Sequence, residues 1–262
     1  MKFYRVNALL LKFWFITRNS LDRVFEIVYW PFIGLLIWGF TANYVLDISS
    51  HPQVLNVLLG GAVLWTFYQR AMQDIGVYIL EDFWSRNVTN LLATPMRLSE
   101  FVTSIFAFGL VRSILTFSFL AFLAFIFYSF NVFSAGIFAV AVFSIVLLLL
   151  GWFFGIFVAG LIFRYGLRIQ VFAWSFSFLI QPFSAVFYPL STLPAWLQNI
   201  CLMIPSTYAF EGMRHAFSTG DILWGHFGIA IVLDLVLLAV GYWFFGKCIR
   251  SAKRTGILTK LE

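Results

Sequence analysis

The chain has 262 residues, of which 62% are hydrophobic and 11% charged, and its formal net charge is +6. A soluble protein of this length cannot hide so much apolar surface, so the composition excludes an ordinary soluble domain. The basic residues flank long apolar runs and do not gather with aromatic residues in one patch, which argues against nucleic-acid binding. The sequence therefore predicts an all-α, polytopic membrane protein that forms one domain over residues 1–262.

The amino-terminal segment, residues 1–23, mixes basic and apolar residues. On a helical wheel Lys2, Arg5 and Lys12 fall on one narrow arc, while apolar residues such as Phe3 lie elsewhere. This pattern predicts an amphipathic helix that lies in the surface of the inner leaflet. The alternative is a solvated positive segment that only sets the orientation of the protein.

Six apolar runs are long enough to cross a hydrocarbon layer of about 30 Å as helices. They are Val24–Leu46, Gln53–Leu80, Phe101–Tyr128, Ser134–Phe163, Ile169–Tyr188 and Trp224–Gly246. Fourteen basic residues lie in the two ends of the chain and in the connections after the second and fourth runs, whereas the opposite connections hold only Arg214. This bias predicts that both termini face the cytoplasm, which agrees with an even number of crossings.

The loop at residues 81–100 is the most suggestive cytoplasmic element. It combines the charged residues Glu81, Asp82 and Arg86 with an apolar ridge, and Pro95 ends the short helix that carries the ridge. The ridge consists of Val88, Leu91 and Leu92. We expect these six residues to dock a partner protein. The alternative is that the ridge packs against the membrane helices of the protein itself.

Ionisable residues inside the apolar runs are few, and each costs at least a few kcal/mol at the centre of a bilayer. Arg112 and Asp234 lie at similar depth in the third and sixth runs. We expect both to face protein or water, paired with each other or with Glu26 or Asp74 as competing partners of the arginine. Arg70 is four residues before Asp74, and its long side chain is expected to reach the membrane surface.

Aromatic residues and small residues suggest two further features of the membrane helices. Packing against lipid explains most of the rings of the apolar runs, but some of them could line a cleft between two copies of the chain that holds a lipid-linked glycan or an apolar drug. Examples are Phe106, Phe108, Phe117, Trp174 and Phe178. Gly151 and Gly155 form a small-residue face suited to close helix packing, either within the chain or between copies.

The segment at residues 189–223 is predicted to be irregular structure on the outer side. Its prolines separate two short apolar helices, near Ala195–Met203 and Thr207–Phe217, which are too short to cross a membrane. Glu211 and Arg214 are three residues apart and are expected to pair.

Two stretches resemble the permease subunits of type-2 ATP-binding-cassette exporters. The first runs from Asn90 to Pro95 and reads Asn-Leu-Leu-Ala-Thr-Pro. The second begins with Val186-Phe187-Tyr188-Pro189, continues through Pro194 and Trp196, and is followed by Ile204-Pro205 and Arg214. Many relatives have Asn-Pro where this chain has Ile204-Pro205. Together with the six runs, the resemblance covers essentially the whole chain.

The resemblance implies a subunit that moves a substrate outward across the bacterial inner membrane. It implies a homodimer or a dimer with a similar permease, and separate ATPase subunits that grip the loop around Glu81–Pro95 and use ATP and magnesium. The outer segment would be a re-entrant gate that includes Tyr188, Pro194, Trp196 and Pro205. No cofactor is expected on this chain itself, because Gly241–Cys248 matches only the glycine and lysine spacing of a phosphate loop and lacks its hydroxyl residue.

Two other classes of function were weighed against the permease. A membrane enzyme is disfavoured, because His51, His215 and His226 fall on the outer side without a catalytic motif. A channel or ion-coupled carrier that needs no ATPase remains the main alternative, although such carriers more often have broken helices in two matching halves. The substrate class stays open between lipid-linked glycans or polysaccharides, drugs and other small molecules.

Overall fold

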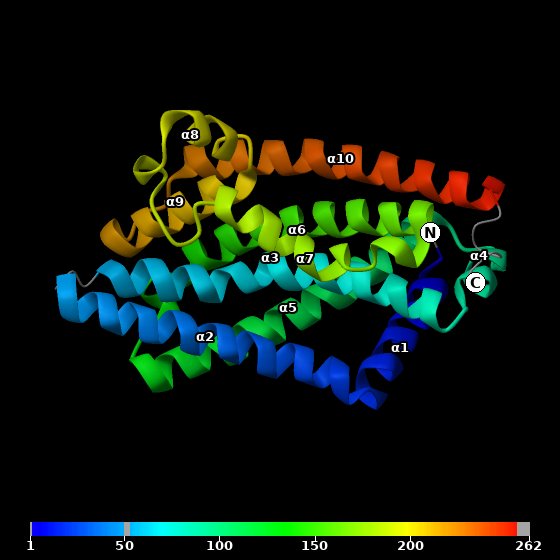
Figure 1. Ribbon diagram of the computed structural model, residues 1–262, viewed down its shortest axis with the longest axis horizontal. Helices are drawn as coiled ribbons and strands as arrows, with labels where there is room; N and C mark the ends of the chain where they lie inside the picture. Colours follow the sequence, from blue (N-terminus) through cyan, green and yellow to red (C-terminus); the bar gives the residue numbers. More distant parts are fainter. Residues whose placement is uncertain (1, 50–52, 256–262) are drawn as a thin grey trace.

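The computed structural model describes residues 2–49 and 53–255, and within these ranges the chain is mainly helical, with no strand. The α-helices are α1 (Phe3–Asn19), α2 (Leu21–Ser49), α3 (Gln53–Trp84), α4 (Val88–Ala93), α5 (Leu98–Tyr128), α6 (Ile137–Tyr165), α7 (Phe172–Ile180), α8 (Ala195–Cys201), α9 (Pro205–Thr219) and α10 (Trp224–Thr255). The long helices run side by side along one axis (Figure 1). The helices α1 and α4 lie at one end of this bundle, the α4 end, and α8 and α9 lie at the other, the α8 end.

Four helical segments among the described residues are long and apolar enough to cross a membrane. They are Leu21–Ile48, Leu98–Tyr128, Ile137–Ile169 and Trp224–Arg254. Helix α3 has 32 residues, which is long enough to cross, but it carries Arg70, Asp74, Glu81 and Asp82. The sequence located these five helices closely, and α10 extends beyond the end expected for the sixth run.

The fifth expected run, Ile169–Tyr188, is not one continuous helix. Its only α-helix, α7, has nine residues, which span about 14 Å of the roughly 30 Å needed. The 3₁₀ turns Gly166–Ile169 and Gln181–Phe183 flank α7, and Pro182 lies in the second of them. A run of helical turns from 166 to 183 followed by irregular backbone therefore replaces the predicted span.

The centre of the bundle is a close contact between α3 and α6. A β-carbon added at Gly151 of α6 would lie 2.6 Å from the carbonyl oxygen of Tyr68, and one added at Gly155 would lie 2.6 Å from the Cδ1 atom of Ile75. Only residues without a side chain allow the two backbones to approach this closely. The small-residue face is thus an internal contact, the α3–α6 seam, and α10 packs against the same helix α6.

Helix α1 packs against α5 and α2. Its buried side consists of Val6, Leu9, Phe13 and Thr17, at the spacing expected for one helix face. The predicted helix is present, but two of its basic residues form ion pairs with other helices. Arg5 pairs with Glu100 at 3.2 Å, and Lys12 pairs with Asp82. Apolar residues occupy the exposed side instead. They are Phe3, Tyr4, Leu11, Trp14 and Phe15.

Candidate functional site

A cavity of about 640 Å³ lies between α2, α3 and α7, and we call it the α2–α7 cleft. Helix α2 contributes Glu26 and Trp30 to it, α3 contributes Gln69 and Arg70, and α7 contributes Trp174. The remaining lining residues are Pro31, Ile33, Gly34, Leu35, Ile37, Trp38, Ala62, Trp65, Thr66, Gln73, Leu120, Phe178, Gln181 and Phe187. The cleft thus combines an aromatic wall with a small set of amide and charged groups, as ligand sites usually do.

The aromatic wall is partly preassembled by stacking. The rings of Trp38 and Phe187 lie 3.6 Å apart between centroids and are inclined by 20°. Among the rings proposed from the sequence, Trp174 and Phe178 line the cleft. The other three pack elsewhere: Phe106 stacks on Trp152, Phe108 contacts Phe13, and Phe117 contacts Phe67.

The charged wall of the cleft includes Arg70, which is only 5% exposed. Its Nη2 atom donates a hydrogen bond to Oε1 of Gln73, and its Nη1 atom lies 3.9 Å from Oδ1 of Asp74. The pairing of Arg70 with Asp74, four residues later, is therefore confirmed. The expectation that the Arg70 side chain reaches the membrane surface is wrong. Packing of α3 among its neighbours encloses the arginine instead.

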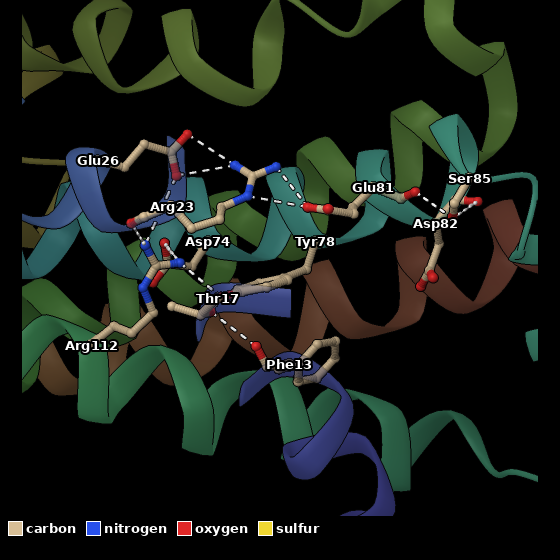
Figure 2. A network of polar contacts seen from close by, with 10 residues as sticks. All are labelled: Phe13, Thr17, Arg23, Glu26, Asp74, Tyr78, Glu81, Asp82, Ser85 and Arg112. Carbon is tan, nitrogen blue, oxygen red and sulfur yellow. Dashed lines mark hydrogen bonds and ion pairs between the residues drawn. The ribbon is translucent and has the colours of Figure 1, made fainter. Parts of the chain in front are cut away.

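Beside the cleft, Arg112 of α5 lies at the centre of a buried polar network (Figure 2). Its Nη1 atom lies 3.1 Å from Oδ1 of Asp74 and donates a hydrogen bond of 2.9 Å to the hydroxyl of Tyr78. Glu26 is farther away, with 3.9 Å between the charged atoms. Asp74 and Glu26 were the competing partners named from the sequence, and the structure makes Asp74 the closer one.

The same network joins α1 and α2 to α3. Arg23 donates two hydrogen bonds to Glu26, at 2.9 and 3.1 Å, and two to Glu81, at 2.7 and 3.1 Å. The hydroxyl groups of Thr17 and Tyr78 lie 2.6 Å apart. A chain of polar contacts therefore leads from α1 and from the end of α3 to Arg112 (Figure 2), and Glu26, which also lines the cleft, belongs to this chain.

Asp234 does not take part in this network, so the predicted pairing with Arg112 is wrong. It is fully buried on α10, whose main contacts are with α6 and α9. Neither carboxyl oxygen has a hydrogen-bond partner among the residues that the structure describes. Similar depth in two helices did not predict the pairing of Arg112 with Asp234, because depth does not determine which sides of the bundle the two helices occupy.

The loop predicted to dock a partner contains two buried anchors. Asp82 pairs with Lys12 and accepts a hydrogen bond from Asn87, and Val88 is buried in the core. For these two residues the expectation of an exposed docking surface is wrong, and the alternative of packing against the protein's own helices holds for Val88. Glu81 is tied to Arg23, and Leu91 is half-buried.

The exposed part of the loop is the connection before and after α4. Arg86 is exposed and adopts a left-handed backbone conformation with φ of 56°, and Asn90 and Pro95 are also exposed. The side chain of Leu92 lies outside the described residues, as does His51. The surface available to a partner is therefore narrower than the predicted one and centres on Arg86 and Asn90.

The segment at the α8 end forms the two short helices expected from the prolines. Pro194 precedes α8, and Pro205 is the first residue of α9 and is buried. Trp196 is 65% exposed, whereas the hydroxyl of Tyr188 donates to the carbonyl of Pro182.

An ion pair on α9 holds the irregular backbone before α8. Arg214 contacts Glu211 at 2.8 Å, which confirms the predicted pair, and it also donates to the carbonyl oxygen of Ala185 at 2.9 Å. Glu211 in turn accepts a 2.6 Å hydrogen bond from the backbone nitrogen of Leu190. Both ends of the pair thus satisfy backbone groups that have no helix to bond to.

The described residues therefore define a helical membrane protein with a cleft, a buried polar network and a short helical cap. The chain belongs to the ABC-2 family of transporter proteins, because the family model matches residues 34–243. No curated protein matches the chain significantly. The matched region includes most of the α2–α7 cleft, α4 and the helical cap at the α8 end.

Proposed function

We propose that this chain is the membrane-spanning permease subunit of an ATP-binding-cassette exporter in the bacterial inner membrane. Separate ATPase subunits would hydrolyse ATP with magnesium, and the permease would carry a substrate outward through the α2–α7 cleft. The family match over residues 34–243 is the observation that carries this proposal. The cleft supports it, because it offers a ligand-sized space next to a polar element of the bundle.

In this proposal the α4 end faces the cytoplasm and the α8 end faces outward. The six crossings would be α2, α3, α5, α6, the helical turns from 166 to 183, and α10. The distribution of basic residues supports the orientation. Helix α3 could cross in spite of its charges, because Arg70, Asp74 and Asp82 are buried against other parts of the protein.

The ATPase subunits would dock on the exposed part of the α4 connection. Because Lys12 holds Asp82, and Arg23 holds Glu81, a push on this connection would be transmitted to α1, α2 and α3 together. Glu26 and Asp74 would carry the displacement on to the wall of the cleft. The outer segment would act as the gate, with Tyr188, Pro194, Trp196 and Pro205 at its moving or anchoring points.

Two copies of the chain would form the working unit. Only 11% of the most apolar part of α2 is buried, although α2 forms one wall of the cleft. Apolar residues such as Ile37 and Phe40 are exposed on it. A second copy and membrane lipids together would cover this surface.

A pull-down in mild detergents tests the proposal. Tagged wild type, Arg86→Glu/Asn90→Asp and the control Arg164→Glu are compared, with bound proteins identified by mass spectrometry and vanadate-sensitive ATP hydrolysis measured. Arg164 is exposed near the end of α6, so its variant makes the same Arg-to-Glu replacement outside the α4 connection. We expect an ATPase with wild type and control, and its loss with the double variant.

Absence of any ATPase from the wild-type pull-down in several mild detergents would contradict the permease assignment. It would favour a channel or an ion-coupled carrier that needs no ATPase. An ATPase that binds the double variant as well as wild type would leave the permease assignment in place and refute the docking surface.

A further inference from the structure

Arg70 has weaker ionic compensation than its two neighbouring arginines. Arg23 has two carboxylates within 3.1 Å, and Arg112 has Asp74 at 3.1 Å. The nearest acid of Arg70 is the same oxygen of Asp74, at 3.9 Å, and its Nη1 atom makes no hydrogen bond with any residue that the structure describes. Arg70 is therefore a buried guanidinium with a donor to spare.

A buried cation of this kind is costly unless an anion compensates it. The planar guanidinium group is suited to phosphate and carboxylate, which accept two parallel hydrogen bonds from it. Arg70 lines the α2–α7 cleft, so a ligand in the cleft lies beside this group. Gln69 lines the same part of α3 and adds an amide donor beside it, whereas the amide nitrogen of Gln73 already donates to Ser177.

The other walls of the cleft are suited to an apolar body. Trp30, Trp38, Trp65 and Trp174 line it together with Phe178 and Phe187. A cavity of about 640 Å³ accommodates a molecule of ordinary ligand size, or one segment of a longer one. Charge at one place and aromatic rings around it are the features that recognise an amphiphile.

We propose that the α2–α7 cleft binds an amphipathic anion, with a phosphate or carboxylate on Arg70 and an apolar or ring-bearing body along the aromatic wall. This inference rests on the proposed function, since the anion is taken to be the exported substrate. It narrows the substrate class to negatively charged amphiphiles and places neutral glycans and neutral drugs outside it.

Binding of two matched probes to the purified permease tests the proposal without an ATPase. The probes are 2-naphthyl phosphate and 2-naphthyl β-D-glucoside, which share the ring body and differ in charge. The protein is held in nanodiscs of zwitterionic phosphatidylcholine, and affinities are measured by titration calorimetry. For wild type we expect the phosphate probe to bind about tenfold tighter than the glucoside probe, or more. A charge-assisted hydrogen bond contributes a free energy of this size.

Variants at Arg70 assign the selectivity to this residue. We expect Arg70→Gln to remove the preference for the phosphate, Arg70→Lys to leave part of it, and the exposed-site control Arg164→Gln to keep it. Gel filtration and the helical circular dichroism signal establish that each variant is folded. If Arg70→Gln does not fold, the wild-type preference together with Arg70→Lys still decides the outcome.

Three results would overturn the proposal: equal affinity of wild type for the two probes, no binding of either probe, or a phosphate preference that Arg70→Gln retains.

A further arm of the experiment adds phosphatidylglycerol to the nanodiscs. If this lipid abolishes binding of the phosphate probe, the anion on Arg70 is a resident lipid headgroup and the assignment to a substrate is refuted. The outcome is independent of the pull-down, so failure of the anion site and failure of the permease assignment are told apart.

Discussion

The two sides of α3 differ in how they meet the rest of the protein. Towards α6, Gly151 and Gly155 bring backbone against backbone, with no room for even one added carbon. Towards α2 and α7, the same helix borders a cavity of about 640 Å³ and places Arg70 and Gln73 at its wall. One side of α3 is a dry, close-packed seam, and the other is an open polar surface.

This difference indicates which parts can move. Close-packed interfaces have few alternative arrangements, whereas a cavity beside a charged network leaves space for helices to shift. We therefore expect α3, α6 and α10 to behave as one unit and α2 and α7 to move relative to it. We expect the buried ion pairs to hold the charged side chains of α3 in a defined arrangement while α2 and α7 move.

The largest expected effect comes from removing the carboxylate on the polar side of α3. Asp74→Leu leaves Arg112 buried without its nearest acid, which costs about 3–5 kcal/mol of stability. Thermal unfolding in detergent measures the loss. Asp47→Leu, at an exposed position of α2, is the control and should change little.

The double variant Asp74→Leu/Arg112→Met separates charge from packing. It removes both partners of the pair, so the part of the loss that comes from Arg112 should return, while Arg70 still lacks its nearest acid. An Asp74→Leu protein as stable as wild type would mean that the polar side of α3 is not held by this pair.

A smaller loss is expected from filling the seam. Gly151→Ala forces a carbon to within 2.6 Å of the Tyr68 carbonyl oxygen, and overpacking of this kind costs about 1–3 kcal/mol. Gly228→Ala is the matched control, because a carbon added at this position of α10 meets no atom within 4 Å. Equal unfolding temperatures for the two variants would contradict the close contact between α3 and α6.

The smallest effect concerns the helical cap at the α8 end. It is a change in the labelling rate of a cysteine, with no change in stability. Cys201 at the end of α8 is fully buried, and burial raises the pKa of its thiol. Because the thiolate is the reactive form, labelling by a maleimide at neutral pH should be slow and should accelerate as the pH rises towards the raised pKa. Labelling is followed by mass spectrometry in a Cys248→Ser background.

If the cap opens during transport, labelling of Cys201 should accelerate in the complex with the ATPase during ATP turnover. Fast labelling of the resting protein at neutral pH, equal to that of the urea-unfolded chain, would show that the cap does not cover this residue.

The sequence predicted the long helices well, because hydropathy reports directly on burial in lipid. It also predicted the two short helices at the α8 end and the Glu211–Arg214 pair, since prolines and i, i+3 spacing are local signals. In the fifth run Pro182 indicates an interruption of the helix, and α7 does end at Ile180, just before the 3₁₀ turn that contains this proline. Hydropathy alone does not distinguish a continuous helix from a broken one.

The site was harder to predict because it depends on contacts between helices. Taken alone, Arg70, which lines the cleft, does not differ in the sequence from an arginine that reaches the membrane surface. Likewise, the spacing of Val88 and Leu91 marks an apolar ridge but not the side of the protein that it faces. The clustering of Gln69, Arg70 and Gln73 with Asp74 in one apolar helix was the available signal for a buried polar wall.

The most direct test of the account uses pulsed electron paramagnetic resonance to measure one distance across the α2–α7 cleft and one within the expected unit of α3, α6 and α10. One spin-label pair is placed at Ile37 of α2 and Leu179 of α7, and a second pair at Ile145 of α6 and Val236 of α10, all exposed positions. Both are made in a Cys201→Ser/Cys248→Ser background, with unlabelled copies in excess. In the complex with its ATPase, vanadate trapping should shift the α2–α7 distance and leave the α6–α10 distance unchanged. An unchanged α2–α7 distance, or equal shifts in both pairs, would contradict a moving cleft beside a fixed seam.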